Sequence, residues 1–118
     1  MEYLYNYRIK PEDIAYAEEF RRKPVGHHSP GLQRVLNRLH GMPLAGKPIL
    51  VCTKPHREWT LALLSGVQGV PPKLVPGKTY RSLHDGLWDI FRTRWKMVTG
   101  EDLEQALARH KKTSRRVA

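Results

Sequence analysis

The fold is decided by residues 48–64, PILVCTKPHREWTLALL, which contain two β-type runs separated by a short polar loop. The first run, residues 48–53, is rich in aliphatic and β-branched side chains, which favour strands. The second run, residues 58–64, alternates in polarity, and one of its faces collects three large side chains, those of Trp59, Leu61 and Leu63. With residues 54–57 as the loop, the pattern predicts an antiparallel hairpin.

A third strand is consistent with the sequence after this hairpin. Two glycines and the pair Pro71-Pro72 favour a turn, and residues 73–75 fit a short edge strand that ends at Pro76 and Gly77. We therefore expect a small antiparallel sheet of two or three strands.

Helical patterns precede the sheet. Residues 11–23 begin with Pro11, and their acidic residues come first and their basic residues last, as the helix dipole favours. Residues 30–40 follow Ser29, a good N-cap, and place four apolar residues on one face, namely Leu32, Val35, Leu36 and Leu39. We predict two N-terminal helices, the second of them ending in a left-handed cap at Gly41.

Helical patterns also follow the sheet. Residues 82–98 begin with Ser82 and Asp85 at capping spacing. Their apolar residues recur at helical spacing: Leu83, Leu87, Phe91, Trp95 and Val98, with Trp88 and Ile90 beside them. The predicted fold class is α+β, with two N-terminal helices, a small two- or three-stranded antiparallel sheet, and a long C-terminal helix plus a short one. We expect a single domain over residues 1–110 and a basic flexible tail over residues 111–118.

The charge balance indicates an acidic partner. The 118 residues carry 21 Lys and Arg against 11 Asp and Glu, which gives a net charge of +10. Residues 42–81 hold six basic side chains and one acidic one, and residues 111–118 hold four and none. A surface of this kind attracts nucleic acid or an acidic protein. No apolar run approaches the roughly 18 residues of a membrane span, and the single cysteine, Cys52, favours a reducing cytoplasm.

Motifs for phosphate or metal binding are weak. Gly77-Lys78-Thr79 resembles the end of a P-loop, but Pro72 occupies a position where that motif needs glycine. Four histidines lack the spacing of metal ligands: His27, His28, His56 and His84. We therefore predict no cofactor-binding residue and no metal ligand in this chain.

Catalytic side chains are equally hard to find. Cys52 lies in an aliphatic run, where cysteine behaves as a small apolar residue on a buried strand rather than as a nucleophile. Asp85 and Asp89 lie one helical turn apart, and they fit a cap and a solvated helix face better than an acid–base pair. No catalytic residue is predicted.

Nucleic-acid binding is the alternative that the residues leave open. Basic and aromatic side chains alternate through one part of the sequence, in the set Arg57, Tyr80, Arg81, Trp88, Arg92, Arg94 and Trp95. Base stacking needs accessible rings, whereas these tryptophans fall on the apolar stripe of the long helix. A small basic nucleic-acid-binding module is therefore the second hypothesis.

A family resemblance runs from residue 24 to residue 98. Its specific part is PVGHHSPGLQRV at residues 24–35, and matching positions continue in the same order with Glu58-Trp59, Tyr80-Arg81-Ser82, Ile90-Phe91 and Arg94. This series resembles the small (light) subunit of N,N-dimethylformamidase.

The resemblance implies a non-catalytic small subunit of a hetero-oligomeric amidohydrolase that acts on a formamide-type substrate. It implies a large catalytic subunit as partner, with two copies of each chain as one arrangement, and it assigns the iron and the catalytic residues to that partner. Arg34, Trp59 and Arg94 are the candidate residues that either lock this domain or reach the partner. Trp59 fits the core better than an interface, and the two arginines fit either role.

Overall fold

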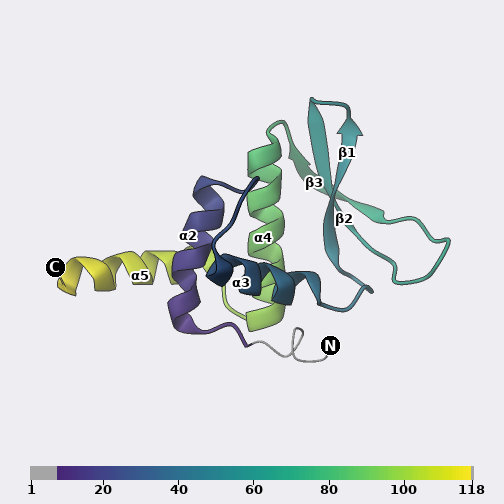
Figure 1. Cartoon of the computed structure of the whole chain (residues 1–118). Coiled ribbons are helices and arrows are strands. Elements are labelled where there is room, and N and C mark those ends of the chain that lie inside the picture. Colours follow the sequence, from purple (N-terminus) through teal and green to yellow (C-terminus); the bar gives the residue numbers. More distant parts are fainter. Residues whose placement is uncertain (1–7, 118) are drawn as a thin grey trace. The chain divides into compact units, whose positions relative to one another are not determined.

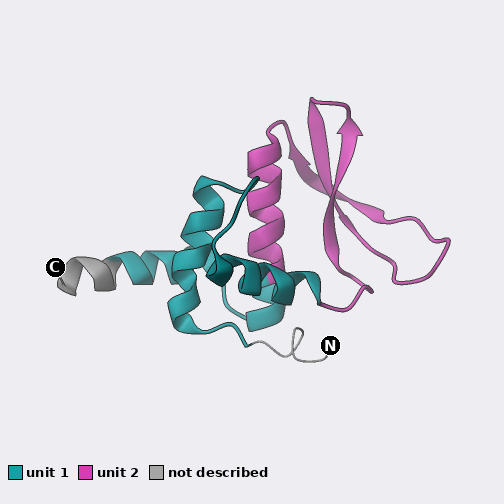
Figure 2. Cartoon of the chain, viewed as in Figure 1, with its two compact units in different colours: residues 1–41, 95–118 teal, residues 42–94 magenta. Residues whose placement is uncertain are grey.

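The computed structural model describes the backbone of residues 8–117 and the side chains of residues 8–111. Its elements, in chain order, are η1 (Pro11–Asp13), α2 (Ile14–Arg22), α3 (Pro30–His40), β1 (Pro48–Lys54), β2 (Glu58–Leu63), β3 (Lys73–Tyr80), α4 (Leu83–Thr99) and α5 (Leu103–Val117) (Figure 1). The predicted α+β fold is confirmed. The chain divides into two compact units, residues 1–41 with 95–118 and residues 42–94, and this division falls within α4 (Figure 2).

The N-terminal helices form as their caps and apolar faces predict. The Ser29 side chain accepts a hydrogen bond from the backbone N–H of Leu32, 3.2 Å away, so it caps α3. The buried side of α3 consists of Gly31, Leu32, Val35 and Leu39, and α3 packs against α2. The left-handed cap predicted at Gly41 is wrong: φ there is −81°, and its N–H bonds to the carbonyl of Asn37 in ordinary helical fashion.

The sheet is an antiparallel meander in the order β1-β2-β3. β3 is longer than predicted, because it continues past Pro76 and Gly77 to Tyr80. The register with β2 shifts between Thr60, opposite Thr79, and Ala62, opposite Leu74, so the proline and the glycine lie in an irregular stretch of an edge strand. An edge strand tolerates proline there because the missing N–H costs no ladder hydrogen bond.

Burial in the sheet differs from the predicted alternation. The central strand β2 is buried at Thr60, Leu61 and Ala62, on both faces, while Leu63 at its end is exposed. Cys52, predicted as a small apolar residue on a buried strand, is exposed. β1 is an edge strand of which only Pro48 is buried, so its aliphatic run lies at the margin of the core and not in its centre.

The long helix α4 keeps its predicted start at Ser82, and α5 begins after Asp102. The Asp85 backbone N–H donates to the Ser82 side chain at 3.3 Å, and the Gln105 N–H donates to Asp102 at 3.0 Å. The buried side chains of α4 are Trp88, Asp89, Ile90, Phe91 and Trp95, whereas Leu83 is exposed. No helix in the described part of the chain is both long enough and apolar enough to span a bilayer.

The last helix is longer than predicted. α5 continues to Val117, so the backbone of residues 111–117 is helical where the sequence suggested an unstructured tail. These residues contain neither proline nor glycine, so nothing in the local sequence ends the helix. The mobility of residues 111–118 and the single domain over residues 1–110 stay predictions, and Ala118 lies outside the described residues.

Candidate functional site

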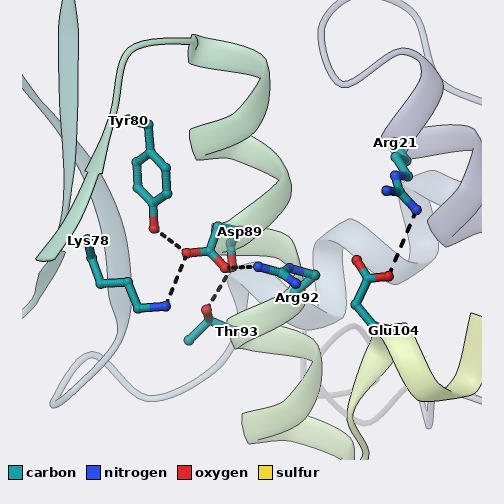
Figure 3. Close-up of polar contacts among 7 residues, drawn as sticks. All are labelled: Arg21, Lys78, Tyr80, Asp89, Arg92, Thr93 and Glu104. Carbon is teal, nitrogen blue, oxygen red and sulfur yellow. Dashed lines mark hydrogen bonds and ion pairs between the residues drawn. The ribbon is translucent and has the colours of Figure 1, made fainter.

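The most organised polar cluster in the unit formed by residues 42–94 is centred on Asp89 of α4 (Figure 3). Tyr80, at the end of β3, donates its hydroxyl proton to Oδ2 of Asp89, and Lys78 places Nζ 3.7 Å from the same oxygen. Arg92, one turn along the helix, donates from Nη2 to Oδ1 at 2.5 Å. Lys78 and Tyr80 are two residues apart on a strand, so both side chains point to the same face.

Electrostatics keeps this cluster charged. Burial alone would raise the pKa of Asp89, but the hydrogen bonds from Tyr80 and Arg92 and the charge of Lys78 outweigh burial and lower that pKa below its ordinary value. Burial, together with the hydrogen bond to Asp89, raises the pKa of Tyr80. Asp89 therefore stays ionised and Tyr80 stays protonated at neutral pH, which suits a structural lock between β3 and α4 rather than proton transfer.

The predicted position of Asp89 on a solvated helix face is wrong. Only 6% of the residue is exposed, because β3 supplies two of the groups that surround it. The prediction for Asp85 holds, since it is exposed and its backbone N–H bonds to the capping side chain of Ser82. No sequence pattern indicates the Asp89 cluster, because Lys78 and Tyr80 belong to the part of β3 that lies beyond its predicted end.

The three predicted interface residues lie in different surroundings. Arg34 is exposed on α3, in the unit formed by residues 1–41 and 95–118. Trp59 is half-buried on β2, where it pairs with Cys52 on one side and Tyr80 on the other. Arg94 is half-buried on α4, and its Nε donates to the backbone carbonyl of Pro48 at 3.0 Å. Arg94 thus joins α4 to the start of β1, and contact of the three residues with a partner stays a prediction.

A basic neighbour of Arg94 was missed by sequence reasoning. Burial, and secondly the charge of Arg94, lower the pKa of Lys47, so two cations lie near each other at the start of β1. Burial also lowers the pKa of Arg94. A lysine and an arginine 47 residues apart give no sequence pattern, and only the contact between α4 and the start of β1 brings them together.

Positive charge dominates the unit formed by residues 42–94. It holds eight basic residues against three acidic ones, a difference of +5: Lys47, Lys54, Arg57, Lys73, Lys78, Arg81, Arg92 and Arg94 against Glu58, Asp85 and Asp89. Two of the three carboxylates already have cationic partners within the unit, because Glu58 lies 3.9 Å from Lys54 and Asp89 is held by Lys78 and Arg92. Of the other cations, Arg57, Lys73 and Arg81 are exposed and give this unit a basic surface.

The described residues offer little support for a metal site or for a nucleophilic cysteine. Among them, no three His, Cys, Asp or Glu side chains come together in a group that could hold a metal ion, so this part of the chain does not fit the iron that the resemblance implies for the enzyme. The thiol of Cys52 is within 3.5 Å of the carbonyl oxygen of Lys54, with no described contact to a histidine that would activate it. Gly77, Lys78 and Thr79 lie inside β3, not in a loop that precedes a helix.

A hollow of about 480 Å³ lies within the unit formed by residues 1–41 and 95–118. Its apolar lining is made of core residues such as Ile14 and Trp95, and its rim includes Glu101 and Arg109, which form an ion pair. It opens to solvent, and two of its charged lining residues, Glu101 and Arg109, are already paired with each other. The arrangement is therefore a surface depression over the core rather than a formed ligand site.

Comparison with known protein families gives a match over most of the chain. A family model described as the N,N-dimethylformamidase alpha subunit matches residues 7–105, which span every helix and strand from η1 to α4 and the start of α5. No curated protein matches the chain. The family match extends beyond residues 24–98, over which the sequence resemblance was seen, in both directions.

Proposed function

The chain belongs to the N,N-dimethylformamidase alpha-subunit family. From this premise we propose that it is the non-catalytic small subunit of a hetero-oligomeric amide hydrolase. In this role the chain binds and stabilises a large catalytic subunit. The observation that carries the proposal is the family match over residues 7–105, because that family is a subunit and not a whole enzyme. The substrate class is a formamide-type amide, and the assembly works in the cytoplasm. The iron and the catalytic residues belong to the large subunit, with two copies of each chain in the assembly.

The described contacts support a binding role. The most strongly engaged carboxylates hold the fold: Asp89 joins β3 to α4, and Glu19 accepts hydrogen bonds from the backbone and the hydroxyl of Ser29 at 2.9 Å and 2.5 Å. An ionised carboxylate with several donors around it is a poor general base, because its pKa is lowered. The net charge of the chain, by contrast, is +10, which fits an acidic partner.

Stabilisation follows from mass action. A partner that binds only the folded chain adds free energy of unfolding of about 2.7 kcal/mol when its free concentration is about a hundredfold above Kd. A chain of this size buries only about two-thirds of its unfolded surface, so such a gain is a large fraction of its stability. The effect is mutual, and the large subunit should therefore be more stable in the complex than alone.

Reconstitution tests the proposal. The small chain, the large subunit and the co-expressed pair are assayed separately for amide hydrolysis by release of formate. We expect no turnover from the small chain alone, full turnover from the pair, and a lower yield of folded, active large subunit when it is expressed alone. Turnover by the isolated small chain would contradict the proposal.

The proposed interface role of Arg34 has its own test. Arg34→Glu reverses an exposed charge on α3, and Gln33→Glu, the neighbouring exposed residue on the same helix, is the matched control. We expect Arg34→Glu to weaken association with the large subunit by about tenfold or more and Gln33→Glu to change it much less. Gln33→Glu changes the net charge by one unit and Arg34→Glu by two, so a loss of binding free energy for Gln33→Glu that is half the loss for Arg34→Glu would mean that only net charge matters.

Nucleic-acid binding is the second candidate, favoured by the net charge of +10. Trp88 and Trp95 are buried at 8% and 2% exposure, so neither ring offers a stacking surface. This candidate predicts affinity for nucleic acid that falls by orders of magnitude as salt rises. Release of bound nucleic acid by nuclease, with no larger polypeptide retained, would favour it over the subunit role.

A further inference from the structure

Exposed aliphatic side chains gather at one end of the sheet. Eight large apolar residues in the described part of the chain are exposed, and five of them belong to the segments that surround this end: Leu44 at 61%, Leu63 at 36%, Val67 at 62%, Val70 at 52% and Leu74 at 49%. We name these five residues the loop-end patch. The loop that carries Val67 and Val70 joins β2 to β3 and extends beyond the strands (Figure 2).

Backbone contacts bring the two segments of the patch together. The N–H of Gly46 donates to the carbonyl of Leu64 at 2.8 Å, and the N–H of Leu64 donates to the carbonyl of Lys47 at 3.0 Å. Gly66 lies so close to Ala45 that no side chain fits between them. The connection that carries Leu44 therefore lies directly beside the loop between β2 and β3.

Hydrogen bonds also give the loop between β2 and β3 a defined shape. The hydroxyl of Ser65 donates toward the carbonyls of Val67 and Val70, at 3.1 Å and 3.2 Å, and accepts from the N–H of Val67 at 3.0 Å. The N–H of Val70 donates to the carbonyl of Val67 at 3.1 Å. A loop held in this way displays its valines in fixed positions instead of folding them into the core.

The surroundings of the patch are cationic. Lys73 lies opposite Leu63 in the sheet and next to Leu74, and Lys47 follows the segment of Leu44. Between Met42 and His84 the sequence holds a single acidic residue, Glu58, which lies at the other end of β2 and pairs with Lys54. Single exposed apolar residues are normal, but a contiguous group with a polar rim marks an interaction site.

We propose that the loop-end patch is the surface with which this chain docks on the large subunit, at an apolar area rimmed by Asp and Glu side chains. The inference rests on the proposed function, which supplies the partner. An apolar centre with a charged rim is the usual anatomy of protein interfaces, and the basic rim requires acidic groups opposite it. Nucleic acid fits less well, because its bases stack on aromatic rings and the patch is entirely aliphatic.

Binding of full-length variants to the purified large subunit tests the patch. Val67→Asp places a charge in the patch, and Val25→Asp is the matched control, since Val25 is equally exposed, at 61%, but lies in the loop between α2 and α3. We expect Val67→Asp to raise Kd by at least about tenfold, and Val25→Asp to leave it within about threefold. Circular dichroism of each variant verifies that it is folded.

The cationic rim is tested separately by salt dependence. Lys73→Glu should slow association and flatten its dependence on ionic strength. Arg57→Glu, at the hairpin between β1 and β2 on the opposite end of the sheet, is the control for net charge and should change association much less. Equal slowing by both variants would overturn the assignment of the rim.

Hydrogen exchange on the wild-type complex gives a readout that needs no variant. Slower exchange of the amides of residues 64–72 in the complex than in the free chain supports the patch. Unchanged exchange there, or unchanged Kd for folded Val67→Asp, overturns it while the complex itself still forms. A wild-type chain that fails to bind the large subunit at all overturns the proposed function instead. A different outcome is that the wild-type chain retains nucleic acid. If Lys73→Glu weakens that retention and Val67→Asp leaves it unchanged, the result overturns the patch and favours the nucleic-acid module.

Discussion

Removal of the Tyr80 hydroxyl is the sharpest test of the lock between β3 and α4. Tyr80→Phe keeps the ring and its packing, and it deletes only the O–H that donates to Asp89. Asp89 remains buried at 6% exposure and keeps Arg92, at 2.5 Å, and Lys78, at 3.7 Å. The carboxylate is thus under-satisfied by one donor and not left without a partner.

The magnitude follows from the kind of hydrogen bond that is lost. A hydrogen bond to a charged group contributes about 1.5–3 kcal/mol to stability. Two cations still hold the carboxylate, so we expect the lower end of that range, about 1.5 kcal/mol of unfolding free energy at neutral pH. For a domain of this size, such a loss lowers Tm by roughly 4–8 °C.

The pH dependence has a definite sign. The pKa of Asp89 is lowered in the folded state, so its contribution to stability is present above the unfolded-state pKa, whose ordinary value is 3.8, and is lost as pH falls through the folded-state pKa. Protonated Asp89 no longer offers a charged acceptor to Tyr80. The difference in stability between wild type and Tyr80→Phe should therefore shrink on acidification below the ordinary Asp pKa.

Urea unfolding followed by circular dichroism, at neutral and at acidic pH, measures both effects. Tyr16→Phe is the matched control, because Tyr16 is half-buried on α2 and its hydroxyl makes no described hydrogen bond. The control should change stability by less than about 0.5 kcal/mol. A Tyr80→Phe variant as stable as wild type at neutral pH, or one whose deficit grows on acidification, would refute the lock.

Two further predictions concern the same kind of local constraint. Ser29→Ala removes the cap of α3 and one donor to Glu19, and we expect it to lower the free energy of unfolding by about 1 kcal/mol at neutral pH. Because Ser29 lowers the pKa of Glu19, this loss of stability should diminish as pH falls through the folded-state pKa of Glu19. Urea titrations that show no loss of stability would contradict the cap. Gly66→Ala combines a φ of +78° with a Cβ that would lie 2.8 Å from the Cα of Ala45, whereas Gly69→Ala has a φ of +84° and open space around it. Thermal melts should show a loss of stability of about 1 kcal/mol for Gly69→Ala and a clearly larger loss for Gly66→Ala. Equal losses would mean that the close approach to Ala45 is unimportant.

Local signals in the sequence were sufficient for much of the fold. Ser29, Pro30 and the apolar spacing after them predicted α3 and its cap, because a cap and a periodic face depend only on residues within a few positions. The hairpin of β1 and β2 was likewise visible, since a turn and two β-type runs are contiguous. The long helix α4 began where Ser82 predicted it.

Features that depend on distant partners were not predictable in this way. Asp89 is buried because Lys78 and Tyr80 reach it from β3, and sequence spacing carries no trace of that contact. Cys52 is exposed because β1 lies at the margin of the core and is buried only at Pro48, which an aliphatic run does not reveal. β3 passes through Pro76 because an irregular register accommodates it, although proline usually ends a strand.

The candidate interface residues also divide into those that the sequence indicates and those that only the structure brings together. Arg34, Trp59 and Arg94 were selected from sequence, and their contact with a partner stays a prediction. Arg94 has an internal role, since it bonds to the carbonyl of Pro48 across the unit. The loop-end patch was missed because Leu44 and Val67 lie in turns, where apolar residues show no periodicity, and only the structure places these turns side by side.

The central claim, that this chain is the small subunit of an amide hydrolase, is tested most directly by the native mass of the assembly that it forms. The chain is purified at moderate salt from cells that also produce the large subunit, and the intact complex is weighed by native mass spectrometry with its iron content measured in parallel. The account predicts a stable assembly of this chain with one much larger, iron-containing polypeptide that hydrolyses formamide-type amides. A chain that elutes alone, or one that brings down only nucleic acid, would contradict it.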